Sequence, residues 1–181
     1  VAEKEIVQYE LSPHLRKYQK NIVTQALNDG CYGIFSDTGT GKTVMGLEIA
    51  THYKKTLILC PLSVIETAWI DDCNKFYPNT KIINVWSNSK QNRIKLLNTP
   101  ADIYVMNYES FKILKNEIRN ADFECLIVDE SSVMKNMTSQ ITNDILETID
   151  YIPHRFVLSG TPTPNHNSEI FPQMKLVDKE I

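Results

Sequence analysis

One short stretch, residues 36–43, constrains this chain more than any other. It reads Ser-Asp-Thr-Gly-Thr-Gly-Lys-Thr. An apolar run at residues 31–35 precedes it, and a helical pattern of apolar residues begins near Lys42. A strand, a glycine-rich loop, Lys-Thr and a helix in that order are the layout of a phosphate-binding P-loop. The alternative is an ordinary glycine-rich turn between strand and helix, and the presence of all four parts argues against it.

Each part of this layout has a chemical purpose. Gly39 and Gly41 let consecutive backbone N–H groups turn inward and form a concave anion site. The helix that follows directs its positive dipole end at the same place. Lys42 adds a mobile positive charge for the terminal phosphates, and the Thr43 hydroxyl is a hard oxygen suited to Mg²⁺. The first position of the pattern holds Ser36 instead of glycine, and because serine is small we expect the loop to close.

The bulk composition is that of one ordinary globular domain. The chain has 181 residues, of which 42% are hydrophobic and 23% are charged. No apolar run approaches the ~20 residues of a membrane span, and no signal peptide is visible. The net charge of −3 is not that of a basic nucleic-acid binder, so any DNA contact must come from a local face. The four cysteines form no C-x-x-C pair, so we expect no zinc and an intracellular, reducing compartment.

Short apolar runs alternate with helical patterns along the chain. Strands are expected at residues 31–36, 56–60, 81–86, 102–106, 125–128 and 155–159. Helices are expected at residues 14–27, 42–52, 63–76, 88–97, 108–118 and 138–149. In the third helix, Ser63 and Glu66 form a capping-box pattern and Trp69 is interpreted as a core residue. Uninterrupted apolar strands joined by helices predict an α/β fold, with a parallel sheet flanked by helices on both faces.

Three polar clusters follow the ends of predicted strands: the P-loop, Asp129-Glu130 and residues 159–161. Because ligands bind at the carboxyl ends of parallel strands, we expect all three clusters at one edge of the sheet. The two acids suit nucleotide hydrolysis: Asp129 would hold Mg²⁺, and Glu130 would orient the attacking water. A pair of solvated carboxylates is the alternative, and a P-loop in the same sheet argues against it.

In this order, the motifs resemble those of superfamily-two helicases and translocases, in particular the Swi/Snf-like branch. The matching motifs are Leu15-Arg16-Lys17-Tyr18-Gln19, the P-loop, Cys60-Pro61-Leu62-Ser63-Val64 with Trp69, Met106-Asn107-Tyr108-Glu109, Asp129-Glu130-Ser131-Ser132 with Lys135-Asn136, and Gly160-Thr161-Pro162 with Asn165. They span residues 15–165, nearly the whole chain. The resemblance implies a RecA-like ATPase lobe, with residues 1–181 as a single domain.

The resemblance also implies roles for individual residues. Gln19 would hydrogen-bond the adenine edge, and Arg16 or Tyr18 would pack near the base. ATP phosphates and Mg²⁺ would be held by Asp37, Thr38, Gly39, Thr40, Gly41, Lys42 and Thr43. Ser132, Ser159 and Thr161 would couple loss of the γ-phosphate to the DNA face, the last two from a strand between those of the P-loop and Asp129. The DNA backbone would be contacted by Ser63, Asn107, Tyr108 and Lys135.

The implied activity is ATP hydrolysis that drives movement on duplex DNA, and backbone contacts suit an enzyme that steps over any sequence. Two features depart from the family. Ser132 stands where the family often has His, which weakens the expected coupling. No stretch resembles the second RecA-like lobe, which carries an arginine finger worth ~10³–10⁵ in rate. We therefore expect a fragment that binds nucleotide weakly and hydrolyses it very slowly alone.

Two other functions fit part of the pattern. An RNA helicase or a restriction-type translocase would carry similar motifs, and preference for duplex DNA over single-stranded RNA separates them. A non-hydrolysing, nucleotide-dependent binding module is the second alternative. The retained Lys42, Asp129 and Glu130 argue against it.

Overall fold

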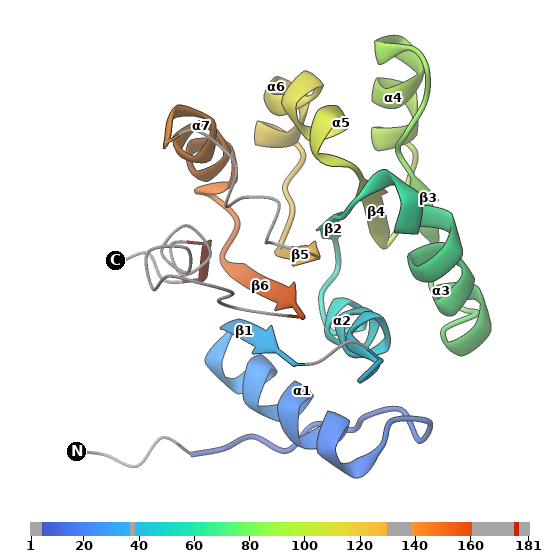
Figure 1. The fold of residues 1–181 in the computed structure, drawn as a ribbon, viewed down its shortest axis with the longest axis vertical. Coiled ribbons are helices and arrows are strands. Elements are labelled where there is room, and N and C mark those ends of the chain that lie inside the picture. The colour runs from blue at the N-terminus through green and yellow to red at the C-terminus, as the bar shows by residue number, and fades with distance from the viewer. Residues whose placement is uncertain (1–4, 37–38, 130–138, 161–175, 178–181) are drawn as a thin grey trace.

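Figure 1 shows the computed structural model of the chain, which describes residues 5–36, 39–129, 139–160 and 176–177. Six residues with predicted roles lie outside this part of the chain, and their roles stay predictions. They are Asp37, Thr38, Glu130, Ser132, Lys135 and Thr161.

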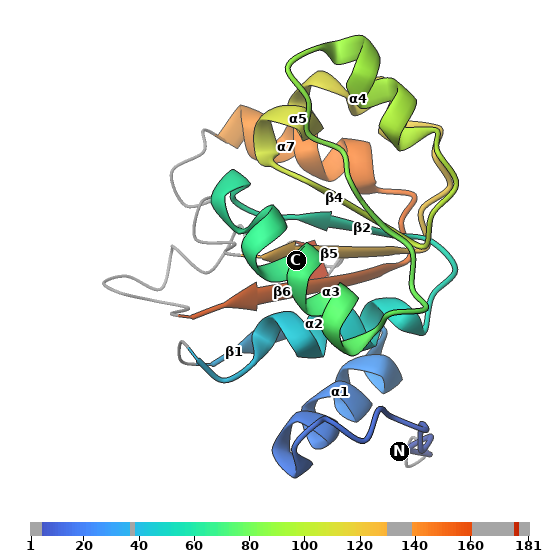
Figure 2. The same cartoon turned by 90° about the vertical axis from the view of Figure 1, so that its right-hand side faces the viewer.

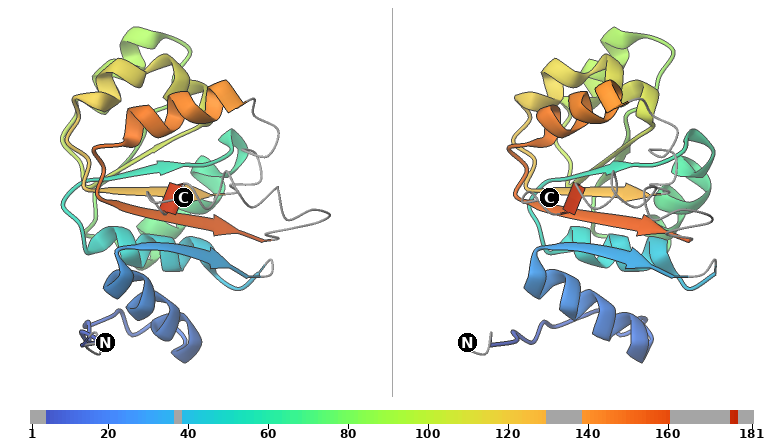
Figure 3. Two further views of the ribbon diagram at one scale, coloured as in Figure 1. Left: turned by 90° about the vertical axis from the view of Figure 1, so that its left-hand side faces the viewer. Right: turned by 60° about the vertical axis from the view of Figure 1, so that its left-hand side comes forward.

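Among the described residues, six parallel strands form one sheet in the order β1-β6-β5-β2-β4-β3. The strands are β1 (Cys31–Phe35), β2 (Thr56–Leu59), β3 (Ile82–Asn84), β4 (Ile103–Met106), β5 (Cys125–Asp129) and β6 (His154–Ser159). Because every pairing is parallel, all six strands end at the same edge of the sheet, and Figure 3 shows the arrowheads of β1, β6, β5 and β2 pointing that way. The predicted α/β class and parallel sheet are therefore confirmed.

Helices cover both faces of this sheet (Figures 1 and 2). One face is covered by α1 (Lys17–Asp29), α2 (Lys42–Thr51), the 3₁₀ turn η1 (Leu62–Val64), the π-helix η2 (Ile65–Ile70) and α3 (Asp71–Phe76). The other face is covered by α4 (Lys90–Leu97), α5 (Tyr108–Ile113), α6 (Lys115–Arg119) and α7 (Ser139–Ile149). None of these described helices is both long and apolar enough to cross a membrane.

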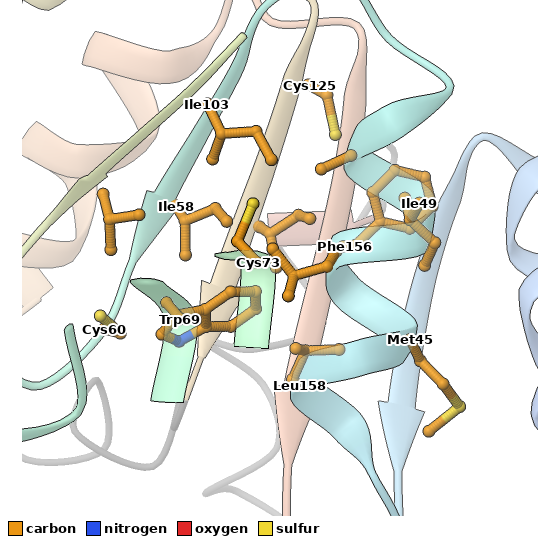
Figure 4. Close-up of a cluster of buried hydrophobic side chains, with 14 of the residues drawn as sticks. Met45, Ile49, Ile58, Cys60, Trp69, Cys73, Ile103, Cys125, Phe156 and Leu158 are labelled. Carbon is orange, nitrogen blue, oxygen red and sulfur yellow. The ribbon is translucent and has the colours of Figure 1, made fainter. Parts of the chain in front are cut away.

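Successive strand residues alternate between two hydrophobic cores. On β2, Leu57 and Leu59 belong to the core under α4–α7, whereas Ile58 belongs to the core under α1–α3. On β5, Leu126 and Ile127 are divided in the same way, and both are fully buried. Figure 4 shows the core beside α2. Strands buried on both faces explain the uninterrupted apolar runs of the sequence.

Three predicted helices differ from the structure. The single helix expected at residues 63–76 is a succession of η1, η2 and α3. α1 begins at Lys17 instead of residue 14, because Gln19 Oε1 accepts a hydrogen bond from the backbone N–H of Arg16 (2.8 Å) and makes Arg16 the N-cap. The single helix expected at residues 108–118 is divided into α5 and α6. Leu114 leaves helical geometry between them, with φ −102° and ψ 18°.

The capping box predicted at Ser63 and Glu66 is wrong. Pro61 is the N-cap of η1, and in this described stretch no side chain caps the turn. The Glu66 carboxylate instead accepts a hydrogen bond from Nδ2 of Asn84, the last residue of β3, at 2.7 Å. Glu66 therefore forms a tertiary hydrogen bond with a strand residue, although the local pattern predicted that it would cap the start of the helix.

Candidate active site

The P-loop joins β1 to α2 at the carboxyl edge of the sheet. β1 ends at Phe35, and α2 begins at Lys42 with Gly41 as its N-cap. Gly39 and Gly41 have φ values of 82° and 80°, the left-handed region that residues with side chains rarely enter. A Cβ atom on Gly41 would also collide with Nε2 of Gln19. The positive φ therefore favours glycine at Gly41, and a larger residue would also have to displace the end of the Gln19 side chain.

Side chains of the loop hold its backbone together. Ser36 Oγ and Thr40 Oγ1 are 2.8 Å apart and form a hydrogen bond across the loop. Lys42 Nζ donates to the backbone oxygen of Ser36 (2.7 Å), so its ammonium lies against the loop. The N–H of Ser36 donates to the backbone oxygen of Ser159 (3.2 Å) and connects the loop to β6. Serine at the first position of the motif therefore closes the loop through its own hydroxyl.

The first turn of α1 is fastened to the same loop. Tyr18 OH and Gln19 Nε2 both donate to the backbone oxygen of Thr40, at 2.8 and 3.0 Å. Gln19 is buried, although the helical pattern alone makes it a surface residue. An amide side chain has two donor hydrogens and can accept two bonds, so its two bonds here leave capacity for a base edge. The adenine contact of Gln19 stays a prediction.

A pocket of about 210 Å³ lies where α1, the loop and α3 meet. Arg16 and Gly39 line it together with two rings, His14 and Phe76. These rings stack with their centroids 5.0 Å apart, and His14 Nε2 lies 3.1 Å from Tyr77 OH. A concave site with aromatic walls and a few polar groups suits a planar base bound beside the loop.

Asp129 is the last residue of β5, and β5 is separated from β1 only by β6. At ~4.8 Å between neighbouring strands, β1 and β5 are ~10 Å apart. The structure therefore brings Asp129 to the same edge of the sheet as Lys42.

The thiol of Cys60, just after β2, lies near Asp129. Burial, with the charge of Asp129 nearby, raises the pKa of this thiol, so the thiol stays protonated and is a poor nucleophile.

Two aromatic residues hold Asp129 from different elements. Trp69 Nε1 donates to Asp129 Oδ2 at 3.0 Å, and Tyr108 OH donates to the backbone oxygen of Asp129 at 3.0 Å. Both the carboxylate and the backbone of the acid are therefore fixed by neighbouring segments.

Ser159 lies between the P-loop strand and the acid strand, as the resemblance implied. It is the last residue of β6, is buried, and pairs with Phe35 of β1. Its neighbour Leu158 pairs with Asp129 on the other side. The end of β6 therefore contacts both parts of the site.

The described residues assigned to DNA contact differ in their surroundings. Ser63 is exposed on η1. Asn107 is buried and caps α5, because its Oδ1 accepts hydrogen bonds from the N–H (3.1 Å) and Oγ (2.6 Å) of Ser110. Tyr108 contacts Asp129 through its hydroxyl. The contacts of all three with DNA stay predictions, and Asn107 already has a structural role.

Sequence reasoning missed a buried acid in α2. Glu48 accepts hydrogen bonds from Tyr77 OH (2.6 Å) and the N–H of Ser12 (3.2 Å), and His52 Nε2 lies 3.5 Å away. Burial alone would raise its pKa, but the hydrogen bonds from His52, Tyr77 and Ser12 outweigh that and lower the pKa to about 2. Ionised Glu48 thus ties the segment before α1 and the end of α3 to the P-loop helix. Its signal in the sequence is a lone acid among the mainly apolar residues 44–50.

Sequence reasoning also missed the polar role of Trp69. The ring is fully buried, as predicted for a core residue, but its N–H donates a hydrogen bond to Asp129, which is 60 residues away in the sequence. No local pattern carries that information.

The family model described as the SNF2-related domain matches residues 14–181 of this chain. A Caenorhabditis elegans homolog of SWI/SNF-related matrix-associated actin-dependent regulator of chromatin subfamily A-like protein 1 is 31% identical over 175 residues, which are 94% of this chain and 25% of the relative. The chromatin-remodeling ATPase INO80 of Saccharomyces cerevisiae is 25% identical over 87% of this chain and 12% of its own length. The chain thus spans a quarter or less of these relatives.

A solved structure shows the same fold. The Sulfolobus solfataricus SWI2/SNF2 ATPase core, solved in complex with dsDNA, matches with a TM-score of 0.79 at 20% identity, over 96% of this chain and 38% of that chain. The predicted RecA-like architecture and the Swi/Snf-like resemblance are confirmed. Because the family model covers nearly all of the sequence, this chain belongs to the SNF2-related domain family.

Proposed function

We propose that this chain is the ATP-binding lobe of a DNA-dependent ATPase that hydrolyses ATP to move on duplex DNA. The observation that carries the proposal is the strand order β1-β6-β5, which gathers the P-loop, Ser159 and Asp129 at one edge of the sheet. The names of its relatives support the same conclusion, since one is a chromatin-remodeling ATPase and the structural neighbour is an ATPase core in complex with dsDNA.

The residues present fit a triphosphate with Mg²⁺. Two left-handed glycines precede the first turn of α2, where backbone N–H groups and the helix dipole favour an anion. Thr43 and Asp129 supply the hard oxygen ligands that Mg²⁺ prefers. Bound Mg²⁺ would neutralise charge on the phosphate oxygens.

The chain's own groups then have distinct tasks. Lys42 now donates to the backbone oxygen of Ser36 and would exchange this acceptor for a phosphate oxygen. Glu130 orients the water that attacks the γ-phosphorus and accepts its proton, which yields ADP and phosphate. Ser159, at the end of β6, and Thr161 report loss of the phosphate to the DNA face.

Further parts of the proposal concern partners. The DNA backbone lies on the loops that follow β2, β4 and β5, with Ser63, Asn107, Tyr108 and Lys135 as contacts. A second RecA-like lobe supplies an arginine finger in the full-length protein. The four cysteines are free thiols, which supports a reducing intracellular compartment, cytoplasmic or nuclear.

Glu130→Gln in the full-length protein tests the catalytic assignment. Turnover, measured as phosphate release with duplex DNA, should fall by ~10²–10⁴, whereas ATP affinity should stay within about threefold. The matched control is Glu124→Gln. Glu124 directly precedes the first residue of β5, and its carboxylate accepts a hydrogen bond from the N–H of Lys54 (2.9 Å). This substitution should leave turnover unchanged. Unaltered turnover in Glu130→Gln would overturn the role of Glu130. Absence of ATP binding at millimolar concentration in the wild type would overturn the function itself.

The same preparation separates the proposal from an RNA helicase. Stimulation of turnover should be greater with duplex DNA than with single-stranded RNA, and should weaken as salt rises because the contacts are to phosphates. Equal or greater stimulation by the RNA would favour the helicase instead.

A further inference from the structure

η2 carries one side chain into the active site from outside the recognised phosphate-binding segments. A π-helix is rare, and single π turns are found frequently at functional sites. In η2, Trp69 is fully buried, and its indole nitrogen donates to Asp129 Oδ2 at 3.0 Å. Figure 4 shows the ring lying over the sheet between Cys60 and Leu158, with its nitrogen toward the carboxyl ends of the strands.

The indole is seated by the P-loop helix. A Cβ atom on Gly46 of α2 would lie 2.8 Å from Cη2 and 3.2 Å from Cζ3 of Trp69, and 3.1 Å from Cδ1 of Leu158. Only glycine at this position lets the ring approach α2 so closely. The ring therefore contacts the helix that begins at the P-loop with one edge, and the acid strand with the other.

In the hydrogen bond between Trp69 and Asp129, the indole can only be the donor. An indole N–H is a donor only, so it pairs with a lone pair of the Asp129 carboxylate. Hydrogen bonds to an ionised group are among the stronger ones in proteins, and a buried planar ring offers its donor with little freedom. One oxygen of Asp129 is thereby fixed, which restricts the direction in which the rest of the carboxylate faces.

We propose that Trp69 is a positioning residue, whose indole N–H holds the Asp129 carboxylate in the orientation that binds Mg²⁺–nucleotide. This inference rests on the proposed function, since it assigns Asp129 to Mg²⁺. It adds a residue of η2, the segment that directly follows Ser63, to the machinery that controls the acid.

Trp69→Phe in the full-length protein tests the inference, because it keeps an aromatic ring and removes the N–H. The measurement is the affinity for a fluorescent ATP analogue, with Mg²⁺ and with EDTA. We expect the gain in affinity from Mg²⁺ to shrink by about tenfold in Trp69→Phe, with little change in EDTA. Trp86→Phe removes the other tryptophan, which is partly exposed, and should leave the gain unchanged.

A double variant separates positioning from packing. In an Asp129→Asn background, Trp69→Phe should not reduce the Mg²⁺ gain any further, because the carboxylate that it positions is gone. A replacement of Trp69 by benzothienylalanine keeps the shape of the ring without the N–H, and should reproduce the loss even if Trp69→Phe fails to fold. A full Mg²⁺ gain with benzothienylalanine would overturn the inference. A wild type that binds no analogue under either condition would instead overturn the proposed function.

Discussion

The two edges of the sheet differ in both the size and the chemistry of their pockets. The pocket at the amino edge, with Lys55 and Tyr104 in its lining, has a volume of about 580 Å³, against about 210 Å³ for the pocket beside the P-loop. Lys55 Nζ donates to the backbone oxygen of Ala121 and lies 5.3 and 4.9 Å from the ring centroids of Tyr104 and Phe123. Burial lowers the pKa of Lys55.

The difference shows that pocket volume does not identify the edge whose chemistry suits an anion. At the amino edge, a lysine is built into the wall, where a carbonyl and two rings stabilise it. At the carboxyl edge, a lysine lies beside a loop whose left-handed glycines precede a helix N-terminus. Only the second arrangement offers backbone N–H groups and a dipole to an anion.

The largest expected effect separates these two lysines directly. Lys42→Met should weaken binding of an ATP analogue by roughly 100-fold, because it removes a charged donor to the phosphates. Lys55→Met should keep the affinity within about twofold and lower the free energy of unfolding by about 1–2 kcal/mol instead. Calorimetric titration and urea unfolding of both variants measure these quantities. Equal losses of affinity would end the distinction between the edges.

The next largest effect concerns Glu48, a buried acid in α2. Although α2 begins at the P-loop, we expect the charge of Glu48 to stabilise the fold and not to bind nucleotide. The pKa of Glu48 is about 2 in the folded chain, below its ordinary value of 4.5. Its stabilisation is therefore complete above about pH 4.5 and is lost as the pH falls toward 2.

Glu48→Gln should lower the free energy of unfolding by about 2 kcal/mol at pH 7, and by less at pH 3. Urea unfolding at the two pH values is the measurement, and the exposed acid Glu147, changed to Gln on α7, is the control. A loss that stays the same at both pH values would contradict the assigned pKa.

The smallest expected effect compares one tyrosine hydroxyl at each edge. Tyr108 OH donates to the backbone oxygen of Asp129 (3.0 Å), and Tyr151 OH donates to that of Ile118 (2.6 Å). Changing either tyrosine to Phe should cost about 1 kcal/mol of unfolding free energy. Only Tyr108→Phe should also reduce DNA-stimulated turnover of the full-length protein, by a few fold. A similar reduction with Tyr151→Phe would show that the effect on turnover is general.

Much of the site was predictable because its parts are local. The P-loop spans eight consecutive residues, and its glycines adopt the conformations that its chemistry requires. The apolar runs before Ser36 and Asp129 identified strands, and parallel strands share an edge. Ser63 shows the limit of local reasoning, since its capping pattern failed when Asn84 bound the carboxylate of Glu66.

The sequence by itself determined the α/β class, the glycine-rich loop between β1 and α2 and the position of Asp129 at the end of a strand, because helical and strand periodicity and glycine conformation are set within a few residues. Only the tertiary structure decided that Gln19 supports Thr40, that η2 is a π-helix, and that Trp69 donates to Asp129 across 60 residues. The physical reason is that the partner of a buried side chain is chosen by packing. At Gly46, for example, the space left by a missing Cβ decides where the indole lies.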